Sequence, residues 1–453
     1  MINNEEYGVN AAETLPKLYI ETYGCQMNVS DSEIVAALMQ KNGFMLADNP
    51  NEADLIFINT CSIRDNAEQR VRGRLDVFRQ YKKKNPELIV GVIGCMAERL
   101  KEQLLEQEET VDIVAGPDAY RDLPHLIQMA SSGQKAVNVR LSKEETYADI
   151  NPLRQGSNKV SAFVSIMRGC NNMCAYCVVP YTRGGERSRD AYSIIDEINE
   201  LASNGYKEIT LLGQNVNSYN WKSVDTELDF PELLDKIAIL FPSLRIRFST
   251  SHPKDMSEKL LYSIAAHDNL CKSIHLPVQS GSNKMLQMMK RGYTREDYMQ
   301  KIESIRKILP DASISTDIIA GFCGENKEDH ALTLSLMQWV GYDFAFMFKY
   351  SERPGTYAAR KYKDDVPEEV KSARLSEIIE FQHKLSGQSK KKDIGKIYEV
   401  LAEGSSKKSN EQLYGRNSQN KVLIFPKGNC TAGDLIMIKV LRHTSATLIG
   451  EIA

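Results

Sequence analysis

Short apolar runs alternate with amphipathic stretches through about the first 130 residues of the chain. The apolar runs have the length and composition of buried strands, and they lie at residues 17–23, 54–60, 87–94 and 111–116. One helical pattern predicts a helix with Ser30 as its N-cap and Gly43 past its end, and another spans residues 63–84. This alternation predicts a parallel sheet covered by helices, which we assign to an N-terminal domain at residues 17–133.

A polar stretch at residues 134–159 has weak periodicity and predicts a linker. Beyond it lie six further apolar runs, at residues 161–167, 208–213, 244–250, 273–279, 313–321 and 342–351. The segment between the first two predicts a helix with Asp190 as N-cap and Gly205 past its end. Six strand–helix units fit an incomplete parallel α/β barrel better than a closed eight-fold one, and we place this barrel at residues 160–386.

The pattern changes again near the C-terminus. A helical pattern at residues 367–389 ends in a run of lysines, and five short apolar runs with glycine turns follow it. Short strands at this spacing predict a small β-barrel at residues 387–453. The predicted fold class is therefore α/β, with an N-terminal parallel α/β domain, a partial (β/α)6 barrel and a small C-terminal β-barrel.

Composition and charge indicate the broad class of protein and show that charge is unevenly distributed along the chain. The 453 residues suffice for two or three domains. No secretion signal is visible, and the longest apolar run, at 88–97, is too short to span a membrane, so we expect a cytoplasmic protein. The net charge of −3 combines +5 in residues 387–453 with −8 in the remainder, which suggests a polyanion-binding tail.

Three cysteines, Cys170, Cys174 and Cys177, lie in a C-x3-C-x2-C loop directly after a predicted strand. The carboxyl ends of parallel strands are where active sites lie in such folds. Thiolates suit an iron–sulfur cluster or zinc. Zinc prefers four ligands, whereas the next histidine is His252, and three thiolates on a four-iron cluster would leave one iron open. Packed, non-ligating cysteines are the remaining alternative.

This loop, with the aromatic Tyr176 before its third cysteine, resembles the radical S-adenosylmethionine (SAM) superfamily. The resemblance implies that the open iron chelates the amine and carboxylate of SAM. Cys25, Cys61 and Cys95 each follow a predicted strand of the N-terminal domain, so we expect them to converge on one sheet edge as a second three-thiolate site. Cys271, Cys323 and Cys430 have no cluster spacing and are expected to be packed or partly exposed thiols.

The two cysteine sets together with the C-terminal β-barrel resemble the methylthiotransferase family, over about residues 17–450. The stretches that look most like its tRNA branch are IETYGCQMNVSDSE, FINTCSIRDNAEQR, GCMAER, SIMRGCNNMCAYCVVPYTRGGERSR, LLGQNVNSY, HLPVQSGS and KYSERPGT. One departure is Cys323 in GFCGE, where the family usually has proline, and this puts the backbone of that loop in doubt. The resemblance also identifies residues 387–453 as similar to the TRAM domain, an RNA-binding barrel.

The resemblance implies an enzyme that adds a methylthio group to C2 of N(6)-dimethylallyladenosine next to the anticodon of tRNA. It implies two [4Fe-4S] clusters, two SAM molecules per turnover and a flavodoxin- or ferredoxin-type reductant; we also expect a monomer. Close alternatives are methylthiolation of threonylcarbamoyl-adenosine in tRNA or of an aspartate in a ribosomal protein. The alternative of a different class is a non-enzymatic iron–sulfur RNA-binding sensor.

Further contacts are expected at strand ends and on the basic tail. Candidates for binding SAM follow or lie in predicted barrel strands, and they are Gln214, Asn215, Gln279, Ser280 and Asp317; Glu186, Arg187 and Arg189 follow the cysteine loop and could pair with the SAM carboxylate or an RNA phosphate. Each of these could equally be a helix cap or an ion-pair partner. Candidates for contacting RNA phosphates are Lys390, Lys391, Lys392, Lys396, Lys407, Lys408, Arg416 and Lys427.

Overall fold

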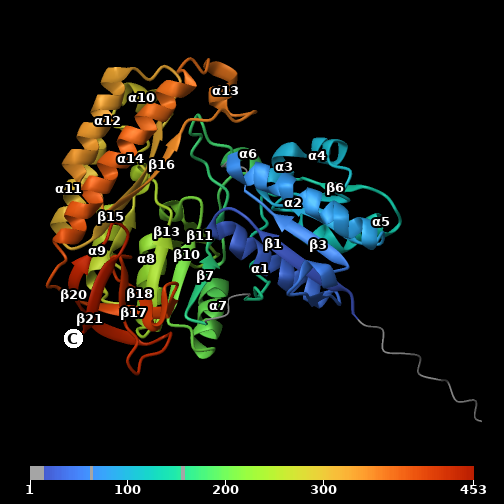
Figure 1. Cartoon of the computed structure of the whole chain (residues 1–453), viewed down its shortest axis with the longest axis horizontal. Coiled ribbons are helices and arrows are strands. Elements are labelled where there is room, and N and C mark those ends of the chain that lie inside the picture. The colour runs from blue at the N-terminus through green and yellow to red at the C-terminus, as the bar shows by residue number, and fades with distance from the viewer. Residues whose placement is uncertain (1–14, 62–64, 155–158) are drawn as a thin grey trace, which may run out of the picture. The chain divides into compact units, whose positions relative to one another are not determined.

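The N-terminal strands form one parallel sheet in the order β2-β1-β3-β4-β5-β6 (Figure 1). The computed structural model describes residues 15–61, 65–154 and 159–453. It divides the chain into two compact units, Met1–Leu141 and Ser142–Ala453. The strands of the first unit are β1 (Lys17–Thr22), β2 (Met45–Leu46), β3 (Leu55–Asn59), β4 (Ile89–Ile93), β5 (Ile113–Ala115) and β6 (Ala136–Asn138).

Two sequence-based expectations change in this unit. Residues 136–138 form the edge strand β6, although the sequence placed them in the linker, because their backbone pairs with β5. Part of that linker, residues 155–158, lies outside the described residues. Ser30 is not an N-cap but a buried residue inside α1, which begins directly after Cys25. The helices are α1 (Gln26–Lys41), α2 (Asp65–Lys84), α3 (Cys95–Leu100), α4 (Glu102–Gln107) and α5 (Leu123–Ser131), with 3₁₀ turns η1 (Pro50–Glu52) and η2 (Tyr120–Asp122).

The second unit contains the six predicted barrel strands, arranged as two three-stranded parallel sheets, β13-β10-β7 and β14-β15-β16. An isolated bridge between Ile246 of β13 and Leu270 joins the two sheets. Among the described residues, the edge strands β7 and β16 do not pair with each other, so the barrel is incomplete, as the sequence predicts. Alternate strand residues face a helix layer and form a continuous apolar core. The strands are β7 (Ser161–Ser165), β10 (Glu208–Leu212), β13 (Arg245–Ser249), β14 (Ser273–His275), β15 (Ser313–Ala320) and β16 (Phe344–Lys349).

Helices cover the outer face of these strands (Figure 1). The prediction of Asp190 as an N-cap is confirmed, because its side chain accepts the backbone N–H of Ser193 at 2.7 Å. The helices are α6 (Val179–Thr182), α7 (Ala191–Ser203), α8 (Phe230–Leu240), α9 (Glu258–Ala266), α10 (Asn283–Met288), α11 (Arg295–Ile308), α12 (Lys327–Val340) and α13 (Tyr357–Lys361). Shorter elements are β8 (Met167–Arg168), β9 (Arg187–Ser188), β11 (Asn220–Lys222), β12 (Glu227–Asp229), η3 (Val216–Ser218) and η4 (Pro253–Asp255).

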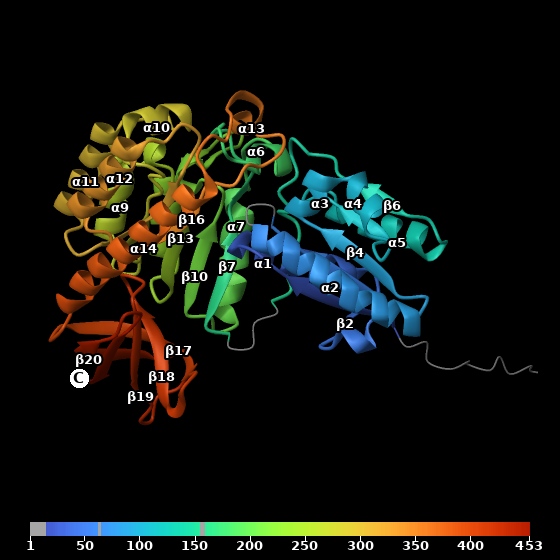
Figure 2. The same ribbon diagram turned by 45° about the horizontal axis from the view of Figure 1, so that its top comes forward.

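The chain then passes through α14 (Glu368–Lys391) into a closed five-stranded barrel of order β17-β18-β19-β21-β20, which confirms the predicted small β-barrel. Its strands are β17 (Ile397–Ser406), β18 (Ser409–Asn417), β19 (Val422–Pro426), β20 (Leu435–His443) and β21 (Leu448–Ile452). The C-terminal barrel lies beside the central strands (Figure 2). The turn after β18 contacts the amino end of β15, where the hydroxyl of Ser313 donates to the carbonyl of Gln419 at 2.6 Å. Among the described residues, no helix is both long enough and apolar enough to cross a membrane.

Candidate functional site

The loop that carries Cys170, Cys174 and Cys177 begins right after β8, at the carboxyl end of the first barrel strand. Gly169 has a φ of +77°, and a Cβ on it would overlap the carbonyl oxygen of Gly185, so only glycine fits there. The backbone N–H of Cys170 donates to the carbonyl of Gly184 at 3.1 Å. The loop is therefore folded back against the RGGER segment that the sequence analysis singled out.

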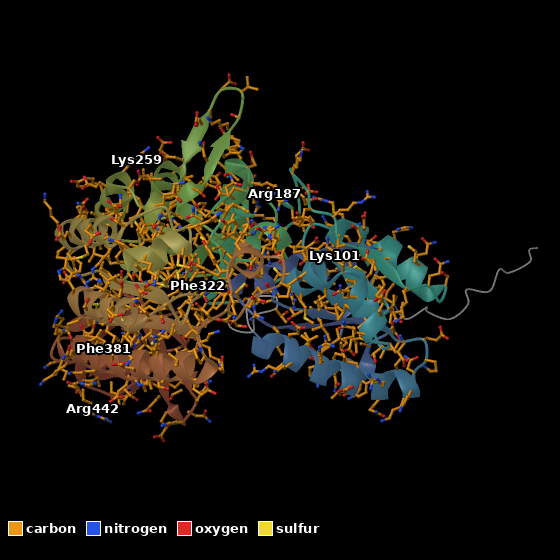
Figure 3. All side chains as sticks on the ribbon, turned by 90° about the horizontal axis from the view of Figure 1, so that it is seen from above. Lys101, Arg187, Lys259, Phe322, Phe381 and Arg442 are labelled. Carbon is orange, nitrogen blue, oxygen red and sulfur yellow. The ribbon has the colours of Figure 1, made fainter. Side chains whose placement is uncertain are left out.

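A small apolar core packs against the loop that carries the three cysteines. Ala175 donates its N–H to Met289 at 2.9 Å and accepts from the N–H of Ala358 at 2.7 Å. The same core contains Phe322, which is labelled in Figure 3, and the buried Cys323. Cys323 is therefore a packed thiol, as expected. Of the other two cysteines without cluster spacing, Cys271 is also buried and Cys430 is half-buried.

The chemistry of these thiols fits a metal cluster. Burial raises the pKa of Cys177 to about 12 and that of Cys170 to about 11, so without a cation both groups stay protonated at neutral pH. Metal coordination deprotonates thiols. Cys174 and Cys177 each already accept a hydrogen bond: Arg291 donates to Cys174 Sγ at 3.2 Å, and the N–H of Val179 donates to Cys177 Sγ at 3.4 Å.

The structure brings the three turns of the N-terminal cysteines together. Cys25 follows β1, Cys61 follows β3 and Cys95 follows β4, and these three strands are neighbours in the sheet. A Cβ on Gly24 would lie 2.5 Å from the Cβ of Cys61, and the N–H of Met96 donates to the carbonyl of Thr60 at 3.3 Å. In residues 15–61, 65–154 and 159–453, however, no three Cys, His, Asp or Glu side chains converge closely enough to bind a single metal ion.

Two predicted SAM contacts at the end of β10, Gln214 and Asn215, differ in whether their side-chain amides already have hydrogen-bond partners in the protein. The Oε1 atom of Gln214 is buried and accepts no hydrogen bond in the described part of the chain. The amide of Asn215 is used at both ends, since it donates to Asp255 at 2.7 Å and accepts from the N–H of His252 at 3.1 Å. Gln214 is therefore open to a ligand, whereas Asn215 joins β10 to the loop after β13.

The other predicted contacts also have protein partners. Gln279 and Asp317 lie together, because the N–H of Gln279 donates to the carbonyl of Asp317 at 2.9 Å, and the Asp317 carboxylate lies 3.3 Å from His275 Nε2. Ser280 is buried beside Thr333, at 3.3 Å between their hydroxyl oxygens. Arg187, labelled in Figure 3, is buried and donates to the carbonyls of Ser142 and Arg183.

Glu186 and Arg189 also have protein partners. The carboxylate of Glu186 accepts the backbone N–H of Asn171 at 3.1 Å, and burial raises its pKa. Arg189 is buried and forms an ion pair with Glu197. These contacts fix the segment after the cysteine loop to its surroundings.

Residues that the sequence analysis missed lie at the end of β13. The Oγ of Ser251 and the Nε2 of His252 are buried and have no hydrogen-bond partner among the described residues, like Gln214 Oε1. Burial, then Arg291 and Lys254, lower the pKa of His252 to about 2, so its ring is neutral. Ser251 and His252 could have been predicted from sequence, because they directly follow an apolar run, as Gln214 does.

Some of the predicted RNA-binding cations contact protein groups, and the others are exposed. Lys390 donates to the carbonyl of Ser445 at 2.5 Å, and Arg416 binds both carboxylate oxygens of Glu403 at 3.0 Å. Lys396 lies 4.0 Å from Asp393. The remaining predicted cations are exposed, and they are Lys391, Lys392, Lys407, Lys408 and Lys427.

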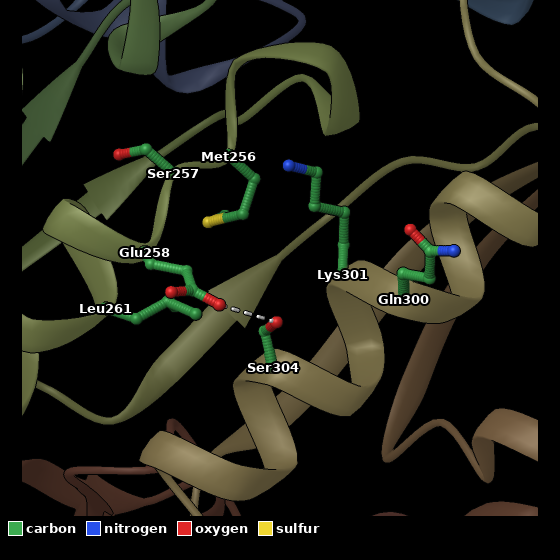
Figure 4. Close-up of a pocket in the computed structure, with 7 residues that line it drawn as sticks. All are labelled: Met256, Ser257, Glu258, Leu261, Gln300, Lys301 and Ser304. Carbon is green, nitrogen blue, oxygen red and sulfur yellow. Dashed lines mark hydrogen bonds between the residues drawn. The ribbon is translucent and has the colours of Figure 1, made fainter.

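A surface pocket of about 290 Å³ lies between α9 and α11 (Figure 4). Glu258 and Ser304 face each other across it, with a hydrogen bond of 3.2 Å. None of the predicted site residues lines it, so it is not part of this site.

Three family models match the chain: the uncharacterized protein family UPF0004 at residues 17–116, the radical SAM superfamily at 164–337 and the TRAM domain at 391–453. A protein of Amoebophilus asiaticus named tRNA-2-methylthio-N(6)-dimethylallyladenosine synthase is 56% identical, and the match covers 99% of this chain and 95% of that relative. A protein of Parabacteroides distasonis with the same name is also 56% identical, with 99% of both chains covered.

A solved radical SAM methyltransferase, TsrM from Kitasatospora setae, has a TM-score of 0.57 at 14% identity, covering 76% of this chain and 75% of that one. At this identity the likeness concerns the fold alone. The matching domains and the near full-length identity together decide the family. The chain belongs to the radical SAM tRNA-2-methylthio-N(6)-dimethylallyladenosine synthase family.

Proposed function

We propose that this protein adds a methylthio group to C2 of N(6)-dimethylallyladenosine next to the anticodon of tRNA. The observation that carries the proposal is the presence of two three-cysteine sets at carboxyl ends of parallel strands, in a chain 56% identical to relatives named for this product. A radical SAM domain requires one such set. The second set favours insertion of sulfur.

Cys170, Cys174 and Cys177 would hold one [4Fe-4S] cluster, and Cys25, Cys61 and Cys95 would hold another. When bound, the cluster of the barrel supplies the electron for reductive cleavage of SAM, and that chemistry activates an unreactive C–H bond. The chain shields Cys61, Cys95 and Cys174 from water, because these three are buried, whereas Cys170 and Cys177 are half-buried and Cys25 is exposed. Glycines before Cys25, Cys95 and Cys170 allow the backbone turns that present them.

The strand ends of the barrel would position SAM. Gln214 Oε1 can accept a hydrogen bond from the ammonium of its methionine moiety, since it has no other donor among the described residues. His252 accepts the N–H of Lys254 on Nδ1 at 3.2 Å, so the neutral ring holds its proton on Nε2 and can donate it. Ser251 Oγ adds a hydroxyl that can donate or accept. Together these groups supply the complementary donors and acceptors that an amino-acid moiety needs.

We further propose that two SAM molecules are used per turnover and that a flavodoxin- or ferredoxin-type protein supplies electrons. We propose that the protein works as a cytoplasmic monomer. The C-terminal barrel would bind the tRNA, since its exposed lysines can neutralise phosphates without reading sequence.

The test separates the two cysteine sets by replacing each with alanine in reconstituted protein. C25A/C61A/C95A should still form 5′-deoxyadenosine from SAM but make no methylthio nucleoside, whereas C170A/C174A/C177A should lose both. Methylthio product from the first variant would contradict this division of roles. Mass spectrometry of tRNA nucleosides and of ribosomal proteins from a deletion strain identifies the substrate, because each enzymatic alternative predicts a different missing methylthio group and a non-enzymatic sensor predicts none.

A further inference from the structure

Arg291 is a buried cation in direct contact with a cysteine of the barrel loop. It lies three residues after α10 and is 4% exposed. Its Nη1 lies 3.2 Å from Cys174 Sγ and 3.3 Å from the hydroxyl of Tyr176. The guanidinium is held from the other side, because Nε donates to the Tyr293 hydroxyl at 2.9 Å and Nη2 to the carbonyl of Pro277 at 2.6 Å. The position of its N–H groups is therefore fixed relative to the sulfur.

No carboxylate balances this charge within the part of the chain that the structure describes, where the partners of Arg291 are one thiol, two hydroxyls and one carbonyl. The hydroxyls of Tyr176 and Tyr293 and the carbonyl of Pro277 are uncharged partners. The neighbouring His252, whose ring packs against Tyr293 at 5.8 Å between centroids, is neutral as well. A buried guanidinium is costly without a nearby anion, and the Cys174 sulfur, which carries negative charge when it ligates a cluster, lies within hydrogen-bond distance of it.

Hydrogen bonds to ligand sulfurs and the nearby charge set the reduction potential of an iron–sulfur cluster. A fixed cation beside one ligand favours the more negative, reduced state because reduction adds one electron and no positive charge. An N–H···S bond also withdraws electron density from the sulfur. Both effects favour the reduced cluster and therefore raise its reduction potential.

We propose that Arg291 is a positioning residue that orients the Cys174 thiolate and raises the reduction potential of the cluster held by the barrel loop. The proposal rests on the proposed function only in that a [4Fe-4S] cluster binds there. Tyr293 supports Arg291 by holding its Nε. The pair would favour the one-electron reduction that SAM cleavage requires.

The experiment is an EPR-monitored redox titration of the reconstituted full-length protein with dithionite, which donates one electron per cluster. The signal that changes on addition of SAM identifies the barrel cluster. In R291M, which removes the charge at similar length, the ratio of reduced to oxidised cluster at a fixed potential should fall about tenfold, which is 59 mV for one electron. R291K and Y293F should lie between R291M and the wild type, because each keeps the charge and loses part of the geometry.

R295M is the matched control. Arg295 lies nearby and donates to the carbonyl of Leu332 at 2.6 Å and to the hydroxyl of Ser335 at 3.0 Å, so its loss should leave the titration unchanged. An R291M variant with full iron content and the wild-type ratio would overturn the proposal. If R291M does not assemble its cluster, R291K and Y293F decide, and a wild-type ratio in both overturns it. The titration needs neither tRNA nor product, so a different substrate would leave its result intact.

Discussion

Gly24 and Cys61 are in contact across two neighbouring strands: a Cβ on Gly24 would lie 2.5 Å from the Cβ of Cys61. Gly24 also has a φ of +121°, which side chains disfavour. The turn after β1 and the end of β3 therefore pack as one unit, and Cys25 follows directly. This packing places the turn that carries Cys25 beside Cys61, although 36 residues separate the two cysteines in sequence.

Replacement of Gly24 by alanine should disrupt the N-terminal cluster selectively. The added methyl group cannot fit beside Cys61, so G24A should lose roughly half of the bound iron and keep SAM cleavage. Iron content and 5′-deoxyadenosine formation measure the two effects. G43A is the control, because Gly43 also has a positive φ, of +85°, but meets nothing within 4 Å. Equal iron loss in both variants would show that backbone strain alone is responsible.

Glu98 should make the stability of the N-terminal unit depend on pH. Burial raises its pKa from 4.5 to about 8, and its Oε2 atom has no hydrogen-bond partner among the described residues. Between these values the folded protein holds a proton that the unfolded chain releases. The free energy of unfolding should therefore fall as pH rises from 4.5 to 8, by up to about 1.4 kcal/mol per pH unit.

Urea denaturation at pH 6 and pH 7.5, followed by circular dichroism, measures this slope. E98Q should flatten it, because the amide is neutral at both pH values and has a similar shape. A slope that is equal in E98Q and the wild type would contradict the assignment to Glu98.

Arg247 should be essential for attaching the C-terminal barrel. It bonds Glu208 at 2.8 Å and the carbonyls of Asn417 and Ser418 at 2.7 and 3.2 Å, and both charged side chains are buried. R247A leaves Glu208 buried and unpaired, so we expect a loss of about 3–5 kcal/mol in the free energy of unfolding. E208L/R247M should lose less, since it removes both charges together. Chemical denaturation measures both, and a loss below about 1 kcal/mol for R247A would exclude this role.

Lys407 and Lys408 should contribute to tRNA binding by neutralising phosphates. Both are exposed in the turn between β17 and β18. K407A/K408A should weaken binding and reduce the slope of log affinity against log salt by about 0.7 for each phosphate that is no longer neutralised. Filter binding at several salt concentrations measures this slope. K390M is the comparison, because the Lys390 ammonium is already bound to the carbonyl of Ser445, and its slope should match the wild type.

The fold was largely predictable because its signals are local. Each of the ten apolar runs predicted in the N-terminal and central parts contains an observed strand, and the C-terminal barrel has its five predicted strands. The predicted start of α1 was wrong by five residues, because Ser30 has a typical capping side chain whereas Cys25 occupies the N-cap position. The strand β6 was missed because three residues in a polar stretch carry too weak a pattern.

The sequence by itself determined where the strands end, and hence which cysteines lie at the carboxyl edges of the two parallel sheets. Only the tertiary structure decided which polar side chains are available to a ligand. Asn215 and Arg187 are hydrogen-bonded to protein groups, whereas Gln214 and His252 each keep an atom without a partner among the described residues. The reason is that hydropathy patterns are set by near neighbours, while such contacts join distant residues: Arg291 meets Cys174 across 117 positions.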